Sequence, residues 1–164
     1  GAVKLAEGER DLLEIRQELT GTGYLRKGSK AGQRNLKVQT RPMEFRSSAG
    51  LRISVGKNNT QNDALTTRQA GKGELWFHTQ KIHGSHVILS TGGEQPDAQS
   101  IAEAASLAAY FSQAQSSTKV PIDFTQVKFV KKPAAAKPGM VVYTNYQTVL
   151  ADPNEELVKH LLVK

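Results

Sequence analysis

Hydrophobic and polar residues alternate between positions 42 and 55 in a pattern that predicts a β-hairpin. Met43 and Phe45 mark the apolar positions of the first arm, and those of the second arm are Leu51, Ile53 and Val55. The run Ser47-Ser48-Ala49-Gly50 between the arms is typical of a tight turn. The pattern therefore predicts two antiparallel strands.

The same alternation predicts further strands at residues 75–79, 85–90, 120–130 and 140–146. The first two form a hairpin-like pair around His83-Gly84. In the third, the alternation changes phase at Gln126, which suggests a bulge. Residues 148–152 are interpreted as a link.

Helical spacing of apolar residues predicts four helices, at 7–19, 63–70, 97–117 and 153–163. The third is the longest, and its many alanines permit close packing on a sheet. Strands outnumber helices and short turns join most of them. We therefore expect an α+β fold, with a mixed, largely antiparallel sheet and one long packed helix.

The composition narrows the class of protein. A chain of 164 residues supports one domain, and it has no Cys, which excludes disulfides and thiolate metal sites. No apolar run is long enough to span a membrane, so we expect no membrane insertion. Gly1 and Ala2 are interpreted as a cloning remnant.

The formal net charge of +7 is concentrated in two segments. Residues 24–57 hold nine Lys or Arg against one acid, and residues 119–137 hold five Lys against one acid, which gives balances of +8 and +4. The remainder is net acidic. Such segregation favours a surface that binds a polyanion, although a solvated basic surface is the simpler alternative.

Three histidines within nine residues, His78, His83 and His86, raise the possibility of a metal site, which Asp63 or Glu74 would complete. Their spacing matches no zinc signature, and no motif marks a nucleophile. We therefore expect a binding module rather than an enzyme, with no cofactor or metal. A metal-dependent hydrolase stays open as an alternative.

The only Trp lies in the run Trp76-Phe77-His78. On a strand, Phe77 faces opposite to Trp76 and His78, and Phe77 is assigned to the core. Trp76 is then either buried as well or, with His78, turned toward a surface on which unpaired nucleotides would stack.

Several blocks of the sequence resemble one known family. They are Gly56-Lys57-Asn58-Asn59-Thr60-Gln61-Asn62-Asp63, Trp76-Phe77-His78-Thr79, His83-Gly84-Ser85-His86-Val87, Glu103-Ala104-Ala105, Leu107-Ala108-Ala109-Tyr110, and Lys131-Lys132-Pro133 with Ala136-Lys137-Pro138-Gly139-Met140-Val141. In this order, over roughly residues 13 to 150, they resemble the NFACT-R domain of the RqcH and NEMF family, also known as fibronectin-binding proteins of the FbpA/PavA type.

The resemblance implies that residues 1–22 hold the end of a coiled-coil helix and that residues 23–164 form an RNA-binding NFACT-R domain. It implies a longer polypeptide with an NFACT-N domain and a coiled coil. It also implies a cytoplasmic, ribosome-associated quality control factor. Such a factor binds obstructed 50S subunits and recruits tRNA for alanine tailing of stalled nascent chains. The family's other name implies an alternative, a cell-surface adhesin that binds fibronectin.

The resemblance and the charge pattern together nominate one set of RNA-binding residues. Cations would neutralise phosphates, while rings and amides would hold unpaired bases. Asp63 is the exception, because a carboxylate on an RNA surface needs another role, such as capping a helix, orienting a histidine or accepting from a base or ribose. The expected residues are Lys57, Asn58, Asn59, Asp63, Arg68, Trp76, His78, Lys81, His83, Ser85, His86, Lys128, Lys131, Lys132 and Lys137.

Overall fold

Two antiparallel sheets organise the computed structural model, which describes residues 4–6 and 41–163. The larger sheet has the order β2-β3-β5-β4-β6-β9: β2 (Met43–Arg46), β3 (Arg52–Val55), β5 (Val87–Leu89), β4 (Leu75–Thr79), β6 (Val120–Gln126) and β9 (Gln147–Ala151). The smaller has the order β1-β8-β7: β1 (Lys4–Ala6), β8 (Val141–Tyr143) and β7 (Val130–Lys131). The expected α+β fold with a largely antiparallel sheet is confirmed.

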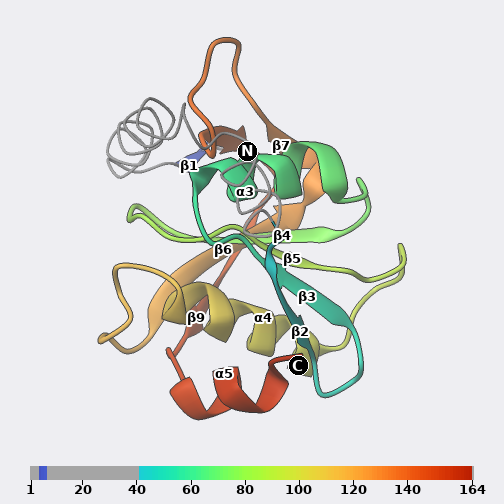
Figure 1. Ribbon diagram of the computed structural model, residues 1–164, viewed down its shortest axis with the longest axis vertical. Coiled ribbons are helices and arrows are strands. Elements are labelled where there is room, and N and C mark those ends of the chain that lie inside the picture. Colours follow the sequence, from blue (N-terminus) through green and yellow to red (C-terminus); the bar gives the residue numbers. More distant parts are fainter. Residues whose placement is uncertain (1–3, 7–40, 164) are drawn as a thin grey trace, which may run out of the picture.

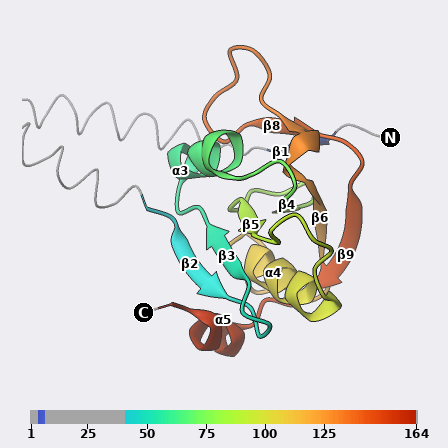
Figure 2. The ribbon, with the colours of Figure 1, turned by 90° about the vertical axis from the view of Figure 1, so that its right-hand side faces the viewer.

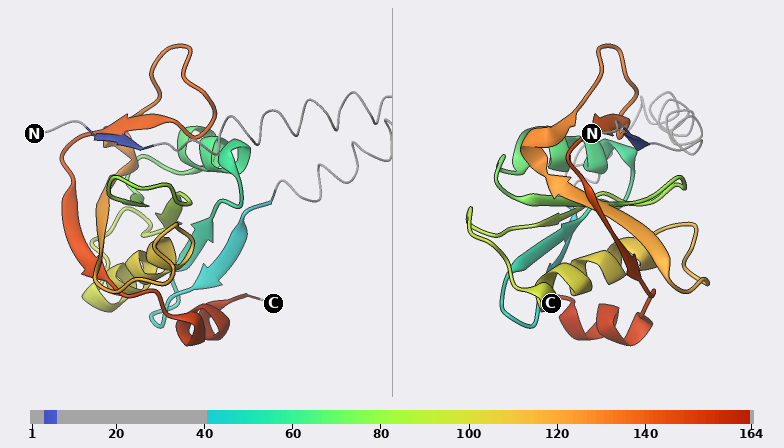
Figure 3. Two further views of the ribbon diagram at one scale, coloured as in Figure 1. Left: turned by 90° about the vertical axis from the view of Figure 1, so that its left-hand side faces the viewer. Right: turned by 180° about the vertical axis from the view of Figure 1, so that it is seen from behind.

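Elements cover both faces of the larger sheet, as Figures 1 and 2 show. Helices α4 (Ala98–Tyr110) and α5 (Glu155–Leu161) lie below the sheet in Figure 1. Above it lie α3 (Asn59–Ala64), the π-helical turn η2 (Leu65–Gln69), the 3-10 turn η3 (Val127–Phe129) and the smaller sheet. The loop that joins β7 to β8 projects from this upper layer (Figure 3).

Side chains of the central strands alternate between two hydrophobic cores. From β4, Phe77 packs with the alanines of α4 in the lower core, and Trp76 packs with Ile88 and Tyr143 in the upper core. Both faces of this strand are therefore buried. The assignment of Phe77 to the core is confirmed.

The helices begin and end at different residues from those expected. The short helix starts at Asn59 rather than Asp63, because the Asn58 side chain caps it by accepting from the Gln61 backbone N–H. The long helix, expected over 97–117, begins at Ala98 after the Asp97 cap and ends at Tyr110, not Ser117. Beyond it, residues 111–113 bond to the turn at 83–85.

Two strand expectations are corrected. The change of phase at Gln126 is not a bulge, because η3 turns the chain there from β6 in the larger sheet to β7 in the smaller one. The link expected at 148–152 is mostly strand β9, paired with β6. It is an edge strand with Gln147, Thr148 and Leu150 exposed, which explains its weak hydrophobic pattern.

The predicted helix at 7–19, with the coiled-coil assignment that rests on it, and residues 24–40 of the basic segment 24–57 lie outside the described residues. Residues 4–6, which are described, form strand β1. Among the residues that are described, no helix combines the length and apolar character that crossing a membrane requires.

Candidate nucleic-acid interface

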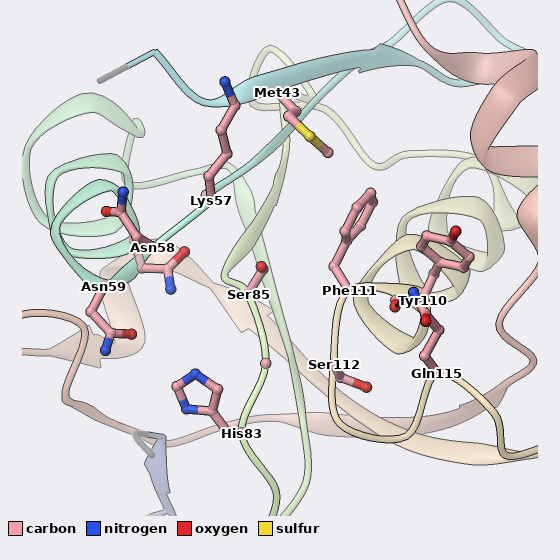
Figure 4. A pocket seen from close by; sticks show the side chains of 13 residues that line it. Met43, Lys57, Asn58, Asn59, His83, Ser85, Tyr110, Phe111, Ser112 and Gln115 are labelled. Carbon is pink, nitrogen blue, oxygen red and sulfur yellow. Dashed lines mark hydrogen bonds between the residues drawn. The ribbon is translucent and has the colours of Figure 1, made fainter. Parts of the chain in front are cut away.

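A pocket of about 450 Å³ lies where three segments meet. Lys57, Asn58 and Asn59, at the start of α3, form one side, and Tyr110, Phe111 and Gln115, at the end of α4, form the opposite side (Figure 4). His83 and Ser85 lie between them. The lining is completed by Met43, Gly56, Asn62, Gly84 and Ser112.

Hydrogen bonds fix the side of the pocket formed by the start of α3. Asn58 accepts from the Gln61 N–H at 2.9 Å, and Gln61 in turn accepts from the Lys57 N–H at 2.8 Å. Asn62 Oδ1 accepts from the His86 N–H at 3.1 Å, which ties α3 to the start of β5. The backbone that carries Lys57 is therefore held in place before any ligand binds.

The turn at His83 to Ser85 is fixed against the end of α4. The Ser85 N–H donates to the Phe111 carbonyl at 3.0 Å, and the Gln113 N–H donates to the His83 carbonyl at 3.1 Å. A Cβ on Gly84 would lie 2.9 Å from Thr79 Oγ1 and 3.0 Å from Ser112 Cβ. Only glycine permits this close approach, so the floor of the pocket depends on it.

The pocket offers cationic, amide and aromatic groups together. Lys57 supplies a positive charge, and no Asp or Glu is among the lining residues that the structure describes. Tyr110 and Phe111 supply rings, which meet in a T-shaped contact with centroids 5.0 Å apart. This combination suits an anion that also carries a flat ring.

The basic loop, residues 131–139, lies beside α3. Asp63 Oδ1 pairs with Lys132 Nζ at 2.8 Å and accepts from the Gly139 N–H at 3.2 Å. Asp63 therefore does not cap its helix; it fastens both ends of the basic loop. Lys131 and Lys137 are exposed, and neither forms an ion pair with another described residue.

The remaining predicted cations are spread over neighbouring elements. Lys128 is exposed on η3, with its amine 5.2 Å from the centroid of the Phe129 ring. Arg68 is exposed on η2. Lys81 is exposed in the turn after β4, with a φ of 64°.

The proposal that Trp76 and His78 face the surface is corrected by the structure. Trp76 is 0% exposed, His78 2% and His86 1%. The upper layer covers them, and the Trp76 ring stacks parallel to His78 at 5.7 Å and lies 4.6 Å from Tyr143. These rings support the fold beneath the pocket and are not available for stacking on a nucleotide.

Burial determines the protonation of the two covered histidines. His86 Nε2 donates to the Gly139 carbonyl at 3.1 Å, so its Nδ1 accepts from the Thr66 hydroxyl at 2.7 Å and the ring is neutral. Burial lowers the pKa of His86 well below its usual value. Burial likewise lowers the pKa of His78 to about 4.

His78 has a carbonyl at each ring nitrogen. Nδ1 lies 2.6 Å from the Thr79 oxygen and Nε2 lies 3.2 Å from the Gly84 oxygen. A neutral ring donates only once, and the shorter contact places the proton on Nδ1. Both nitrogens of His78 and of His86 thus lie within 3.2 Å of an oxygen atom of the chain itself. Among the described residues, no group of three His, Asp or Glu is placed to hold a metal ion.

A buried carboxylate that sequence reasoning did not single out lies next to His78. Asp123 is fully buried and accepts from the Tyr143 hydroxyl at 2.6 Å, the Thr148 hydroxyl at 2.6 Å and the Gln80 amide at 3.1 Å. Burial and this hydrogen bond raise the pKa of Tyr143. Asp123 joins the two sheets and has no access to the pocket.

The structure brings five of the predicted residues into the pocket and adds others. The five are Lys57, Asn58, Asn59, His83 and Ser85. Sequence reasoning missed Met43, Phe111, Ser112 and Gln115 as lining residues, and it treated Tyr110 only as part of a helical block. The signal in the sequence was Tyr110, an aromatic residue at the polar end of an alanine-rich helix.

The amino-acid sequence is similar to those of known proteins. The model of a family described as the NFACT protein RNA-binding domain matches residues 41–145. The chain is 47% identical over 150 residues to a Bacillus subtilis (strain 168) protein named Rqc2 homolog RqcH, a match that covers 91% of this chain and 26% of that protein. A Streptococcus suis (strain 05ZYH33) protein of the same name is 40% identical over 164 residues, covering 99% of this chain and 28% of that protein.

A solved structure is also similar. It is described as the C-terminal of the fibronectin/fibrinogen-binding protein from Streptococcus suis, and it matches with a TM-score of 0.72 and 41% identity over 75% of this chain and 49% of that one. The chain spans about a quarter of the length of the curated relatives it matches.

Proposed function

Because the chain belongs to the family of NFACT RNA-binding domains, we propose that its basic loop binds the phosphate backbone of RNA. The observation that carries the proposal is the cluster of exposed lysines on η3, β7 and the basic loop: Lys128, Lys131 and Lys137. Lys132 and Asp63 fasten this loop beside an acid-free pocket. Exposed cations on neighbouring elements suit the phosphates of an RNA backbone.

In its intact protein, we propose that the domain serves a ribosome-associated quality control factor in the cytoplasm. Such a factor would bind obstructed 50S subunits and recruit tRNA for alanine tailing of stalled chains. The names of the relatives, at 40–47% identity, support this assignment. The remaining steps would involve the NFACT-N domain and coiled coil that the resemblance implies.

The direct test measures binding of this chain to tRNA by fluorescence anisotropy between about 50 and 300 mM KCl. We expect log Kd to vary linearly with log salt. Replacing Lys131 and Lys137 together with Glu should weaken binding and reduce the slope by about one per lost phosphate contact. Salt-independent binding, or no binding, would contradict the proposal.

A control variant with the same net charge as the Lys131/Lys137 double variant tests whether the position of the charges matters. Arg46→Glu with Lys159→Glu reverses two exposed cations far from the basic loop in sequence, with side chains 55% and 68% exposed. The Arg46/Lys159 double variant should bind tRNA more tightly than the Lys131/Lys137 double variant. Equal losses from both pairs would mean that net charge, not this surface, drives binding. Co-sedimentation with 50S subunits then tests the ribosomal partner.

Fibronectin is a second candidate partner, because the similar solved structure carries that name. A basic surface also adsorbs acidic proteins without specificity, and salt screens such binding. Surface plasmon resonance against immobilised fibronectin at about 150 and 500 mM salt separates the two cases. Saturable binding that survives at high salt would support an adhesin.

A further inference from the structure

We propose that the pocket at Lys57, Ser85 and Tyr110 receives one unpaired nucleotide of the bound RNA, with its base against the Tyr110 ring and its phosphate at the Lys57 amine. This inference rests on the proposed function and adds a second subsite to the basic loop. The loop would bind backbone of any sequence, whereas the pocket would require a base that is free of a duplex.

The size and lining of the pocket fit a nucleotide. Its volume of about 450 Å³ lies within the roughly 300 to 1,000 Å³ typical of small-molecule sites. Lys57 is exposed and forms no ion pair with another described residue. The described residues that line the pocket include no carboxylate to oppose a phosphate.

Tyr110 is placed to contact a base. It is partly exposed and lines the pocket opposite Lys57 (Figure 4). Its T-shaped contact with Phe111 sets the orientation of the ring, and Phe111 is itself anchored on Phe45 with centroids 6.0 Å apart. An anchored ring loses little conformational freedom when a base stacks on it.

The walls are fixed in a way that selects unpaired bases. Asn58, Gln61 and Asn62 hold one wall, and the backbone bonds from Ser85 and Gln113 hold the other. A base inside a duplex is covered on both faces by its neighbours and cannot enter such a recess. A nucleotide in a loop, a bulge or a single-stranded end can enter.

The pocket adjoins the end of the basic loop. Asn59 lines the pocket, and its side chain lies 3.2 Å from the position that a Cβ of Gly139, at the end of the basic loop, would occupy. One RNA strand can therefore pass from the pocket to the loop. Binding at both places would give more affinity than either subsite alone.

The test compares two RNA hairpins, one blunt and one with three unpaired nucleotides at its 3′ end, of which one is 2-aminopurine. We expect the extended hairpin to bind this chain roughly 5- to 100-fold more tightly, the range for one stacked base. Its 2-aminopurine fluorescence should fall on binding, because stacking on an aromatic ring quenches it.

Variants separate the ring from the charge. Tyr110→Ala should remove the preference for the extended hairpin, whereas Tyr110→Phe should keep the preference. Lys57→Ala should reduce it, and Arg46→Ala, which loses the same charge elsewhere, should not. A preference unchanged in both Tyr110→Ala and Lys57→Ala would overturn the pocket assignment.

A second measurement does not depend on RNA binding by the loop. AMP, UMP and inorganic phosphate are titrated into the labelled chain, and amide shifts are followed by NMR. Shifts at Ser85 and Gln115 with nucleotides, but not with phosphate alone, support the pocket. Equal shifts with phosphate, or no shifts, overturn it. If nucleotides cause no specific shifts but tRNA binding remains salt-dependent, only the pocket proposal fails. If nucleotides cause specific shifts but tRNA binding is absent or independent of salt, only the loop proposal fails.

Discussion

Gly56 occupies a position at which any side chain would collide with Asn62. A Cβ built there would lie 2.0 Å from Asn62 Oδ1 and 3.0 Å from the Asn62 backbone nitrogen. Asn62 Oδ1 is the acceptor for the His86 N–H, so moving it leaves a buried donor without a partner. We expect Gly56→Ala to lower the free energy of unfolding by roughly 2 to 4 kcal/mol, measured by urea denaturation.

Gly73 provides the matched control. A Cβ there would meet Gly93 Cα at 3.6 Å, an ordinary van der Waals contact, and the residue is exposed. Gly73→Ala should change stability by less than about 0.5 kcal/mol. Equal effects of the two substitutions would show that loss of glycine itself, not the contact with Asn62, is responsible.

The buried histidines predict a loss of stability in mild acid. The pKa of His78 falls from 6.5 to about 4 on folding because burial opposes its charged form. Between these values the unfolded chain binds more protons than the folded one. The contribution of His78 to the free energy of unfolding is therefore fully present above pH 6.5, and it is lost as the pH falls toward 4. His78 alone should account for roughly 3 kcal/mol, and His86 acts in the same direction.

Urea denaturation at several pH values measures this loss, and NMR of the histidine ring carbons assigns it. The ring of His78 should remain neutral in the folded protein down to about pH 4. A ring that titrates near 6.5 while the chain stays folded would contradict the prediction.

Among the helices and strands, the spacing of apolar residues identified those in which this spacing is regular. The hairpin of β2 and β3, the pair β4 and β5, and α4 each bury alternating or helically spaced apolar residues, and all are present as expected. Their ends were less predictable. The end of α4 depends on backbone bonds to the 83–85 turn, 26 or more residues away in sequence. No local pattern carries that information.

The basic loop depends on one acidic side chain of α3. Asp63 holds both Lys132 and the Gly139 N–H. We expect Asp63→Ala to increase amide hydrogen exchange at Gly139 and Met140, because the loop loses its fastening. Global stability should fall by only about 1 kcal/mol or less, since the ion pair is partly exposed.

Asp63→Asn separates the two contacts. Its amide oxygen can still accept from Gly139 while the charge for Lys132 is lost, so exchange at Gly139 should stay close to that of the original chain. If Asn accelerates exchange as much as Ala does, the ion pair rather than the hydrogen bond fastens the loop.

For the whole molecule, Asp123 connects the sheets. It lies on β6 of the larger sheet, accepts from Tyr143 on β8 of the smaller sheet, and also accepts from Thr148 on β9. Asp123→Ala would leave three donors without this acceptor in or near the core. We expect a loss of roughly 3 to 5 kcal/mol in the free energy of unfolding, measured by thermal or urea denaturation.

A double-mutant cycle with Tyr143→Phe isolates the contact between the sheets. Because the two residues share one hydrogen bond, the double variant should lose less than the sum of the single losses, with a coupling of roughly 0.5 to 3 kcal/mol. Strictly additive losses would show that Asp123 does not join the sheets through Tyr143.

The amino-acid sequence alone predicts the α+β class and most of the elements, and it shows the segregation of charge and the family resemblance. These follow from local spacing and residue type, which act over a few neighbouring residues. Lys57, Asn58, Asn59, His83 and Ser85 belong to a larger set predicted from the sequence. These five line one pocket, whereas Trp76, His78 and His86 of the same set are buried. Their role in binding RNA stays a prediction.

Which rings are accessible depends on how distant elements pack. Trp76 and His78 lie on one face of β4, and whether that face is surface or core depends on whether α3, η3 and the smaller sheet fold over it. Those elements cover it, so the second core takes the Trp. The partly exposed rings of the pocket are instead Tyr110 and Phe111, which lie opposite Lys57 because α3 bonds to His86 and the residues after α4 bond to the 83–85 turn. Such proximity arises from long-range packing, which spacing along the chain does not encode.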